Sequence, residues 1–547
     1  MNRVSIGLAV TLLLGTSGLL PAQGAPMPRP ATRAERTGYT ETSRHADVIR
    51  FFDSLILMRA PIVVTELGRS GEGRVLPLVI ASRPTVRTPA EARALRRPIV
   101  YVQANIHAGE VEGKEAVQAL LRDLSFNTAP NVLDSIVLLV VPIYNADGNE
   151  RFGDQARMRG AQNGPAQVGQ RPNAQNLDLN RDYIKAEAPE TRATLAAFAA
   201  WEPDVFMDLH TTNGSYHGYH LTYSPSLQPA APLAPYVGDT MLVTIRARMQ
   251  QRHNFRIFPY GNFTGESGRG SLTDTMKSAF VTYEHKQRFG TNYYGLRGGI
   301  SILSEAFSHD AFDVRVASTR AFVQEVLSYV AERPAEIRSR VAAGRAASTF
   351  SATGARPPVA VRSRFWSKPD TQAVLVEVLE RLTDSTARHE PGMPIGLKRT
   401  GRLASVRMPV VDRFESALDR TAPAGGWILD ASAADSALPR LRAHGVTFER
   451  VATAFTADVE LFIVDSIARA ARPFQGHQEV TLSGRWQRAT RTVPAGSWRI
   501  PLGTNRDRLA MLLLEPESDD GLVTWNFLDR GLSKAQPAPV WRLVTPR

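Results

Sequence analysis

The sequence predicts an α/β fold in which a mixed, mostly parallel sheet is covered by helices on both faces. Short, fully apolar segments such as 136–141 and 205–209 are typical of strands that are buried on both sides. These segments alternate with amphipathic segments of helical periodicity, for example 112–124. A chain of 547 residues also exceeds the usual size of one domain, so we expect two or more domains.

The alternating pattern occupies the first part of the chain, and each predicted element follows from its periodicity. Residues 46–58, 112–124, 190–201, 237–251 and 314–331 have the amphipathic pattern of helices, and residues 62–67, 75–81, 98–104, 136–141, 205–209 and 299–303 have the short apolar runs of strands. A glycine-rich turn over 68–73 joins the first two strands. The segment from Asn145 to Asp182 is too long for a simple connection, so it is either functional or disordered.

Residues 1–25 have the pattern of a secretory signal peptide. Arg3 supplies a basic start, an apolar stretch follows, and Ala22 and Gly24 satisfy the small-residue rule for cleavage near Gly24 or Ala25. The apolar stretch is just long enough to span a bilayer, which leaves a membrane anchor as the alternative, although glycine and serine residues dilute it. We therefore expect a secreted or periplasmic protein with no stable membrane insertion after cleavage.

The rest of the chain divides by composition. We expect a leader over 26–42, a first domain over 43–345, a linker over 346–363 that is rich in Ala, Ser, Thr, Gly and Pro, and a β-rich accessory domain over 364–547. Within the accessory domain, we expect a strand and a helix over 427–431 and 437–444, and strands over 480–486 and 509–514. A β-sandwich that shields or extends a cleft of the first domain is our expectation for this region.

Composition excludes several kinds of chemistry. The chain has no cysteine, which excludes disulfides, thiolate-bound zinc, iron–sulfur clusters and a cysteine nucleophile, so any metal ion must be held by His, Asp or Glu. The net charge of +12 comes from basic residues that are scattered along the chain, without the basic run of a nucleic-acid-binding protein. We expect no nucleic-acid partner. A solvated surface explains the charge, and affinity for an anionic envelope surface or for acidic substrates is the alternative.

Three predicted strand ends carry residues suited to chemistry. His107 and Glu110 follow one strand, His210 follows a second, and Glu305 follows a third. Ligands of α/β sheets gather at the carboxyl ends of strands. Two histidines and one glutamate, with a fourth position left open, form a ligand set of catalytic zinc ions.

These residues also have plain structural interpretations. A His-x-x-Glu pattern is common by chance, so His107 and His210 could be capping or core histidines. Four neighbouring residues compete for the same roles: Glu112, Glu115, His217 and His220. The two glutamates begin a predicted helix, where acidic side chains stabilise the N-terminus. The two histidines lie further into their loop, where they remain candidates for pocket residues.

Six segments, in this order, resemble the zinc carboxypeptidases of the M14 metallopeptidase family. They are Leu67–Arg74, Asn105–Glu110, Asn145–Gly148, Asp178–Asp182, Asp208–His210 and Ser304–Glu305. The resemblance spans roughly residues 43–331, and the segment 512–525 resembles the tails of long bacterial members of the group. The ordered set makes a chance origin of the His-x-x-Glu pattern much less plausible than the pattern alone would.

The resemblance implies the ligands and the base of a peptidase. His107, Glu110 and His210 would bind one zinc ion, and Glu305 would be the general base that activates water. Asp178 would be the carboxylate that orients the first zinc histidine. Asp208 could act in the same way on His210, and plain burial explains it equally well.

The resemblance also implies residues that contact the substrate. Asn180 and Arg181 match the pair that binds a terminal carboxylate, a task that suits a planar guanidinium. The arginine that stabilises the oxyanion would lie in the long loop, where we favour Arg159 over Arg157.

A mobile tyrosine covers the substrate in this family, upstream of the catalytic glutamate. The chain offers Tyr283, Tyr293 and Tyr294, of which we choose Tyr294. Arg297 nearby is either a further carboxylate contact or a surface charge.

The leading hypothesis is an exported zinc metallocarboxypeptidase that acts on peptides with a free C-terminus. A zinc amidohydrolase or deacylase, like the aspartoacylase and succinylglutamate desuccinylase group, or a hydrolase of cell-wall peptides is the alternative on the same fold. The non-enzymatic alternative is a degenerate member that binds peptides or envelope polymers. It predicts the loss of a ligand or of the base, and all four residues are present in the sequence.

Overall fold

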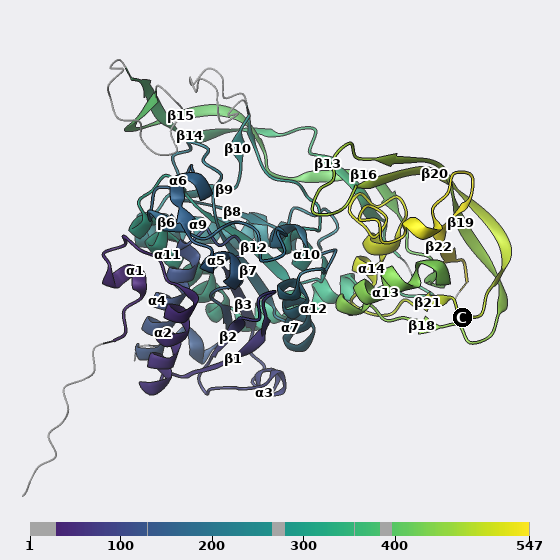
Figure 1. Ribbon diagram of the computed structural model, residues 1–547, viewed down its shortest axis with the longest axis horizontal. Helices are drawn as coiled ribbons and strands as arrows, with labels where there is room; N and C mark the ends of the chain where they lie inside the picture. Colours follow the sequence, from purple (N-terminus) through teal and green to yellow (C-terminus); the bar gives the residue numbers. More distant parts are fainter. Residues whose placement is uncertain (1–28, 128–129, 265–278, 355, 383–396, 546–547) are drawn as a thin grey trace, which may run out of the picture.

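The computed structural model describes residues 29–545 except 128–129, 265–278, 355 and 383–396. The predicted signal peptide lies outside these residues. The centre of the first part of the chain is an eight-stranded mixed sheet (Figure 1). In spatial order its strands are β1 (Ile62–Arg69), β2 (Val75–Ala81), β4 (Val137–Val141), β3 (Ile99–Ala104), β7 (Val205–Thr211), β12 (Ile300–Ala306), β8 (Leu221–Pro225) and β9 (Ile257–Pro259). The inner strands β4, β3, β7 and β12 are parallel, whereas β2 joins β4 and β8 joins β12 in the antiparallel sense.

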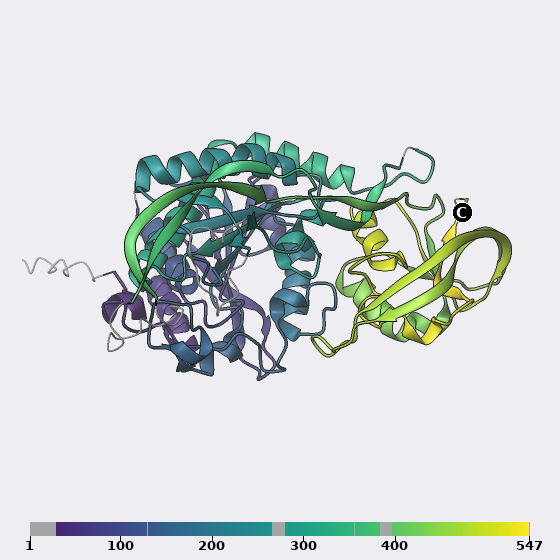
Figure 2. The same cartoon turned by 90° about the horizontal axis from the view of Figure 1, so that it is seen from above.

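Helices cover both faces of this sheet (Figures 1 and 2). One face carries α2 (His45–Leu57), α4 (Glu112–Phe126), α9 (Leu242–His253) and α11 (Phe312–Glu332), which share a buried apolar cluster with the strands. The other face carries α7 (Pro189–Trp201) and α10 (Gly290–Leu296). Because both faces are covered, every residue of the four inner strands is buried, which explains their continuous apolar runs. The predicted fold class is confirmed.

The predicted elements of the sheet are present with small shifts at their ends. Strand 75–81 coincides with β2, and helix 237–251 begins with a π-helical turn, η3 (Val237–Met241), that leads into α9. The segment from Asn145 to Asp182 is structured by short elements: α5 (Ala146–Glu150), β5 (Gly153–Asp154), α6 (Gln155–Met158), β6 (Gln167–Val168) and η2 (Leu179–Arg181). Several elements that are short or lack a clear apolar period are not predicted from the sequence, among them α3 (Pro89–Ala94), β8, α10 and α12 (Pro334–Ala347).

A long hairpin from the second half of the chain pairs with strands of the first part. β14 (Asp370–Arg381) and β15 (Leu397–Val411) form a four-stranded sheet with β10 (Asn262–Phe263) and β11 (Phe280–Val281), in which β15 pairs parallel with β11. Figure 1 shows this hairpin extending above the central sheet. β13 (Val359–Phe365) and β16 (Phe414–Arg420) pair with each other between the two parts. The predicted boundary near residue 364 therefore has strand pairing across it, and the domain limits stay a prediction.

The C-terminal part is built on a six-stranded sheet. Its order is β18 (Glu449–Arg450), β21 (Trp498–Ile500), β17 (Trp427–Leu429), β22 (Pro537–Leu543), β19 (Phe455–Arg469) and β20 (Val480–Val493). Helices α13 (Ala434–Ala443) and α14 (Asp507–Leu514) share an apolar cluster with one face of this sheet. The expected β-sandwich is therefore wrong, because helices cover a face where a sandwich has a second sheet. The strand predicted over 509–514 is wrong for a related reason: a short apolar run fits a buried helix as well as a strand.

The two parts share one core. The apolar cluster on the α7 face of the central sheet continues into the C-terminal part through Trp427, Leu509 and Trp525. At the boundary, the guanidinium group of Arg288 lies 2.8 Å from Asp520 and 2.6 Å from Glu479. The C-terminal part is therefore packed against the first part through buried apolar and charged contacts.

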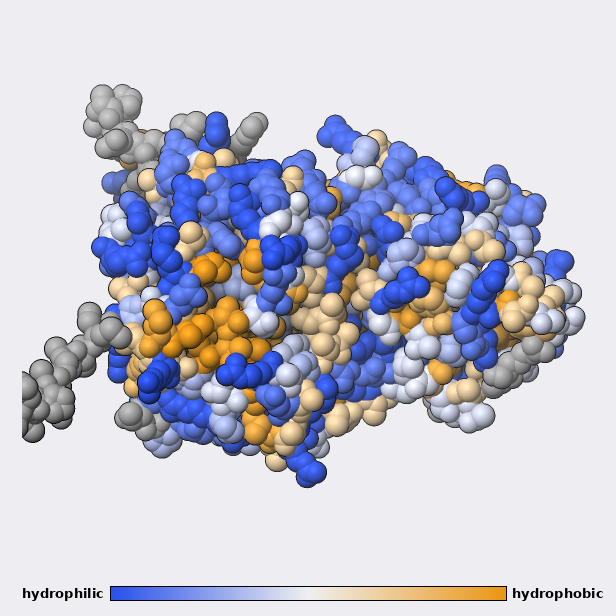
Figure 3. All heavy atoms as spheres, turned by 60° about the horizontal axis from the view of Figure 1, so that its bottom comes forward, coloured by the Kyte–Doolittle hydropathy of each residue, from blue (hydrophilic) through white to orange (hydrophobic). Residues whose placement is uncertain are grey.

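The surface combines hydrophilic residues with scattered apolar ones. Figure 3 shows one face on which hydrophilic residues predominate around a hydrophobic area. Exposed large apolar side chains include Leu57 and Val243, and single exposed apolar residues are ordinary for folded proteins. Within the described ranges, no helix has the length and apolar character needed to span a membrane.

Candidate metal centre and catalytic site

The site lies at the carboxyl ends of three adjacent parallel strands. β3 leads into the turn that carries His107 and Glu110, His210 lies near the end of β7, and Glu305 lies near the end of β12. Glu305 is the register partner of His210 across the β12–β7 pair. The topology of the central sheet therefore brings together residues that are far apart in the sequence.

A tight turn after β3 aims His107 and Glu110. Asn105 has a positive φ of 66°, which asparagine tolerates better than most residues, and its amide donates to the carbonyl oxygens of Ala108 and Glu110. Gly109 leaves space for the backbone near residue 169, since a Cβ there would lie 2.9 Å from the Gly169 oxygen. The turn thus depends on residue types that permit unusual or crowded backbone.

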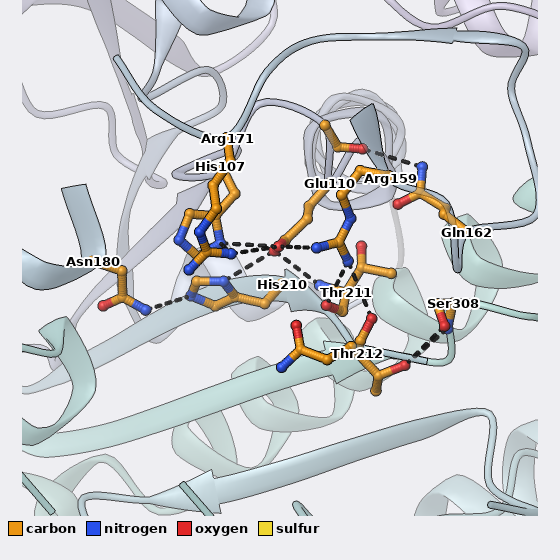
Figure 4. Close-up of polar contacts among 12 residues, drawn as sticks. His107, Glu110, Arg159, Gln162, Arg171, Asn180, His210, Thr211, Thr212 and Ser308 are labelled. Carbon is orange, nitrogen blue, oxygen red and sulfur yellow. Dashed lines mark hydrogen bonds and ion pairs between the residues drawn. The ribbon is translucent and has the colours of Figure 1, made fainter. Parts of the chain in front are cut away.

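The side chains of His107, Glu110 and His210 converge (Figure 4). One ligand atom from each lies within 4.8 Å of the others, and all three residues are buried. The Nδ1 atom of His107 lies 2.9 Å from one Glu110 carboxylate oxygen, and the Nδ1 atom of His210 lies 3.1 Å from the other. This arrangement is a possible metal-binding group that uses the Nδ1 atoms of both imidazoles.

The outer nitrogen of each imidazole lies against a carboxylate. His107 Nε2 lies 3.1 Å from Asp178 Oδ1, and His210 Nε2 lies 2.9 Å from Asp208 Oδ2. Metal-binding histidines commonly donate their other ring N–H to a carboxylate, which fixes the ring and its tautomer. Asp178 is within hydrogen-bonding distance of His107, whereas Asp208 Oδ2 makes only an ion-pair contact with His210 and has no hydrogen-bond partner among the described residues.

Electrostatics fit a divalent cation at this position. Although burial opposes charge on His210, Asp208 and Glu110 raise its pKa well above the usual value. Burial likewise opposes ionisation of Asp178, yet His107 and Arg171 hold its pKa below the usual range. The buried carboxylates therefore favour positive charge between them, and two imidazoles with one glutamate suit zinc.

The competing acidic residues and histidines face other partners. Glu112 accepts from the Thr211 hydroxyl and lies 3.4 Å from Arg315, while Glu115 accepts from Thr42 and Ser43. Four residues lie away from the metal group: Glu112, Glu115, His217 and His220. For example, His220 pairs with Asp310 at 2.7 Å.

Glu305 lies in a small cavity with the metal group. The cavity has a volume of about 70 Å³ and is lined by residues that include His107, Glu110, His210, Asn180, Arg181, Arg171 and Glu305. Burial and the nearby Glu110 raise the pKa of the Glu305 carboxyl, and its Oε2 atom has no hydrogen-bond partner among the described residues. A carboxylate of this kind is available for proton transfer, and a bound cation would lower its pKa again.

Asn180 and Arg181 also line this cavity, as the sequence analysis expects for a carboxylate-binding pair. Asn180 accepts from the Gly290 N–H at 2.9 Å through its Oδ1 atom, so its amide is held in place. The Arg181 guanidinium lies 4.2 Å from the centre of the Phe289 ring. Both side chains thus have a fixed support next to the cavity.

Arg171 lines the cavity, and Arg159 does not. Arg159 donates to the carbonyl oxygens of Thr211 and Thr212 and lies 3.0 Å from Glu110. Arg171 lines the cavity and lies 2.8 Å from Asp178. The choice of Arg159 is therefore not supported. The short sequence separation between Arg171 and Asp178 could have indicated that Arg171 lies near the metal group.

The choice of Tyr294 is also not supported. Its ring packs against Phe198 and Phe206, and its hydroxyl donates to the Pro203 carbonyl oxygen in the core. Tyr283, which was one of the candidates, lines the cavity together with Tyr260. Three other candidates from the sequence analysis do not line it: Arg157, Tyr293 and Arg297.

Two further segments of the resemblance contact each other instead of the cavity. Ser70 donates to Asp147 at 2.6 Å, and the Glu72 N–H donates to the other oxygen of Asp147 at 2.9 Å. Arg74 lies 2.6 Å from the same carboxylate. The Leu67–Arg74 and Asn145–Gly148 segments therefore lock the turn between β1 and β2 onto the long loop.

Comparisons with known proteins place the chain near zinc carboxypeptidases. Residues 54–294 match the model of the zinc carboxypeptidase family, Peptidase_M14. Carboxypeptidase 2 of Trichophyton equinum is 22% identical over 497 residues, which cover 87% of this chain and 81% of that protein. Carboxypeptidase 2 of Trichophyton tonsurans is 23% identical over 493 residues, with the same coverage. These alignments cover more of the chain than the matched family region and therefore extend beyond it.

Solved structures give matches that cover about half of the chain. A metallo-carboxypeptidase from Burkholderia cenocepacia is 19% identical, covers 53% of this chain and 70% of its own, and has a TM-score of 0.39. Carboxypeptidase A from Helicoverpa armigera is 13% identical, covers 54% of this chain and 75% of its own, and has a TM-score of 0.38. The family match and the carboxypeptidases aligned over most of the chain support a metallocarboxypeptidase, an enzyme that is similar to the zinc carboxypeptidases over residues 54–294.

Proposed function

We propose that the protein removes single residues from the free C-terminus of peptides with the help of one zinc ion held by His107, Glu110 and His210. The observation that carries this proposal is one small cavity that combines the metal group, Glu305 and the Asn180–Arg181 pair. A pair of residues able to bind a carboxylate beside the metal group suits the end of a chain better than its middle. An exopeptidase therefore fits the geometry better than an endopeptidase.

The residues of the chain divide the chemistry between them. A bound zinc ion polarises the scissile carbonyl and makes water more acidic. Glu305 accepts the proton of the attacking water and passes it to the leaving amine. Arg171 stabilises the negative charge that develops on the carbonyl oxygen, and Tyr283 lies where it can contact the substrate. Asp178 holds the orientation of His107 through all of these steps.

Asn180 and Arg181 select a free carboxylate. The Arg181 guanidinium can donate two parallel hydrogen bonds to a carboxylate, and the Asn180 amide can add another. An amide at the C-terminus has no negative charge and offers N–H groups where these donors need oxygen atoms. We therefore expect a strong preference for substrates with a free C-terminus.

A panel of N-terminally blocked peptides tests this proposal. Each peptide is offered with a free and with an amidated C-terminus, with and without a chelator, and the products are identified by mass spectrometry. Loss of one C-terminal residue from the free form alone, abolished by the chelator, is the expected result. Cleavage within the amidated peptides contradicts it, and release of only the blocking acyl group would favour a deacylase.

We also propose a setting for this enzyme. The N-terminal pattern supports export, with cleavage near Gly24 or Ala25, and the tail supports a long bacterial form in which an accessory domain over 364–547 follows the catalytic domain over 43–345. N-terminal sequencing of the protein recovered from outside the cytoplasm tests the first part. A mature chain that still begins at Met1 would contradict it.

A further inference from the structure

The tip of a hairpin in the C-terminal part reaches the catalytic site. β19 and β20 are joined by a loop in which Phe474 and His477 exchange both backbone hydrogen bonds, at 2.7 and 3.0 Å. The two residues between them, Gln475 and Gly476, have φ values of 51° and 79°. This is a two-residue turn with positive φ at both central positions, which normally selects Asn-Gly or Gly-Gly. Glutamine at such a position is strained, and strained residues gather at functional sites.

Contacts with the catalytic part hold the 474–477 turn in place. The Gln475 side chain accepts from the Asp178 N–H at 2.7 Å, and His477 lies 3.0 Å from Glu187. Asp178 is the residue whose carboxylate fixes His107. Gln475 therefore connects the C-terminal part to Asp178, the residue that holds His107 in position.

The turn forms one wall of a groove beside the catalytic cavity. The groove has a volume of about 550 Å³ and is lined by Arg171, Pro172, Asn176, Asp178, Arg181, Asn213, Phe474 and Gln475. Arg171, Arg181 and Asn213 also line the catalytic cavity, so the two spaces adjoin. Phe474 is 38% exposed, so part of its side chain is open to the groove and to solvent.

We propose that the 474–477 turn is a substrate-binding element, and that Phe474 contacts the peptide residues that precede the scissile bond. This inference rests on the proposed carboxypeptidase function. The small catalytic cavity holds the end of the substrate, so the preceding residues must leave through an adjoining space. A second cavity, of about 430 Å³, shares only Tyr260 with the catalytic cavity among the described residues. The groove shares three residues with the catalytic cavity. The exposed ring of Phe474 in the groove favours apolar side chains in the peptide.

Peptides of increasing length test the inference. Acetylated peptides of two and four residues share the same C-terminal residue, and the longer ones carry either leucine or aspartate at the positions before the scissile bond. The readout is the kcat/KM of the four-residue leucine peptide divided by the kcat/KM of the two-residue peptide. In the full-length zinc enzyme, Phe474→Ala should lower this ratio about tenfold, because the loss of one apolar contact has an effect of that size. Phe474→Leu, which keeps an apolar side chain, should restore most of the ratio.

Phe365→Ala is the matched control. Phe365 is 43% exposed and stacks on Phe414, which lines the second cavity. This variant should keep the wild-type ratio. A loss in Phe365→Ala but not in Phe474→Ala would place the substrate in the second cavity and overturn the inference. Equal losses for short and long peptides in Phe474→Ala, with unchanged zinc content, would also overturn it, because they indicate a structural role.

Gln475→Gly distinguishes the backbone strain at residue 475 from the hydrogen bond between its side chain and Asp178. Glycine accepts the positive φ without strain but lacks the amide that binds the Asp178 N–H. If the turn acts on substrate, this variant should lower the same peptide ratio while leaving the unfolding temperature unchanged or higher. An unchanged ratio would show that the position of the turn does not affect long substrates. Failure of the wild-type enzyme to cleave a peptide of either length would refute the carboxypeptidase function itself, which is a separate outcome.

Discussion

His444 lies at the contact between the C-terminal part and the catalytic part. It follows the last residue of α13 and is completely buried. Its Nδ1 atom lies 2.9 Å from the Tyr293 hydroxyl, and its Nε2 atom lies 3.0 Å from the Ile184 carbonyl oxygen. A neutral ring satisfies both contacts: the Tyr293 hydroxyl donates to Nδ1, and Nε2–H donates to the carbonyl oxygen.

The contribution of His444 to the free energy of unfolding follows from the pKa of its ring. Burial, with the positive charges of Arg297, Arg440 and Arg506, lowers the pKa of His444 from 6.5 to about 4. Each pKa unit corresponds to about 1.4 kcal/mol, so the shift amounts to about 3 kcal/mol. Below pH 6.5 the unfolded chain takes up a proton that the folded chain does not, and this part of the stability is lost as the pH falls toward 4.

His444→Gln tests this value. The free energy of unfolding is measured by urea titration of the wild type and the variant at pH 7.5 and pH 4. The variant lacks the titrating group, so the advantage of the wild type at pH 7.5 should shrink by about 3 kcal/mol at pH 4. A difference between the two proteins that stays constant with pH would refute the assignment of a neutral, buried His444.

Other substitutions separate the roles within the site. Glu305→Gln should lower kcat by about three orders of magnitude with zinc still bound, because only the proton acceptor is lost; near-normal turnover would exclude Glu305 as the base. Arg171→Ala should lower kcat more than Arg159→Ala does, and the reverse order would restore Arg159 as the oxyanion contact. Asp178→Asn should weaken zinc affinity about 10- to 100-fold, as measured by competition with a chelator. Arg181→Ala should lower kcat/KM for peptides with a free C-terminus and reduce their advantage over any residual cleavage of amidated peptides, and an unchanged advantage would contradict its contact with the carboxylate.

The metal group could be predicted because it depends on a regular part of the fold. His210 and Glu305 lie near the ends of buried strands whose apolar runs are legible in the sequence, and His107 and Glu110 follow a third. Parallel strands bring such ends to one edge of a sheet, whatever the rest of the chain does. The expectation that Asp178 orients His107 came from the resemblance to the family, and the two side chains are in contact.

The substrate-facing residues could not be predicted in the same way. Arg159 and Arg171 share one irregular loop. Tyr283 precedes the short helix α10, which the sequence did not predict, and Tyr294 lies within that helix. Without a repeating pattern, the direction of a side chain depends on contacts that only the folded chain defines. Tyr294 packs on Phe198 of α7, on the same face of the sheet, and no local signal indicates this contact.

The C-terminal part shows the same limit at a larger scale. Its strand and helix over 427–444 and the start of β20 were predicted, because their periodicity is clear. The apolar run of α14 fits two kinds of structure, and in the folded chain every residue of this segment is buried as part of a helix. The approach of Phe474 and Gln475 to Asp178 joins positions about 300 residues apart, a distance over which sequence patterns carry no information.

Zinc content measured by mass spectrometry tests the central claim most directly. After dialysis against buffer with a trace of zinc, the wild type and Glu305→Gln should each retain one zinc ion per chain, whereas His107→Ala and His210→Ala should retain almost none. Stoichiometric zinc in either histidine variant, or none in a folded wild type, would contradict the metal centre described above.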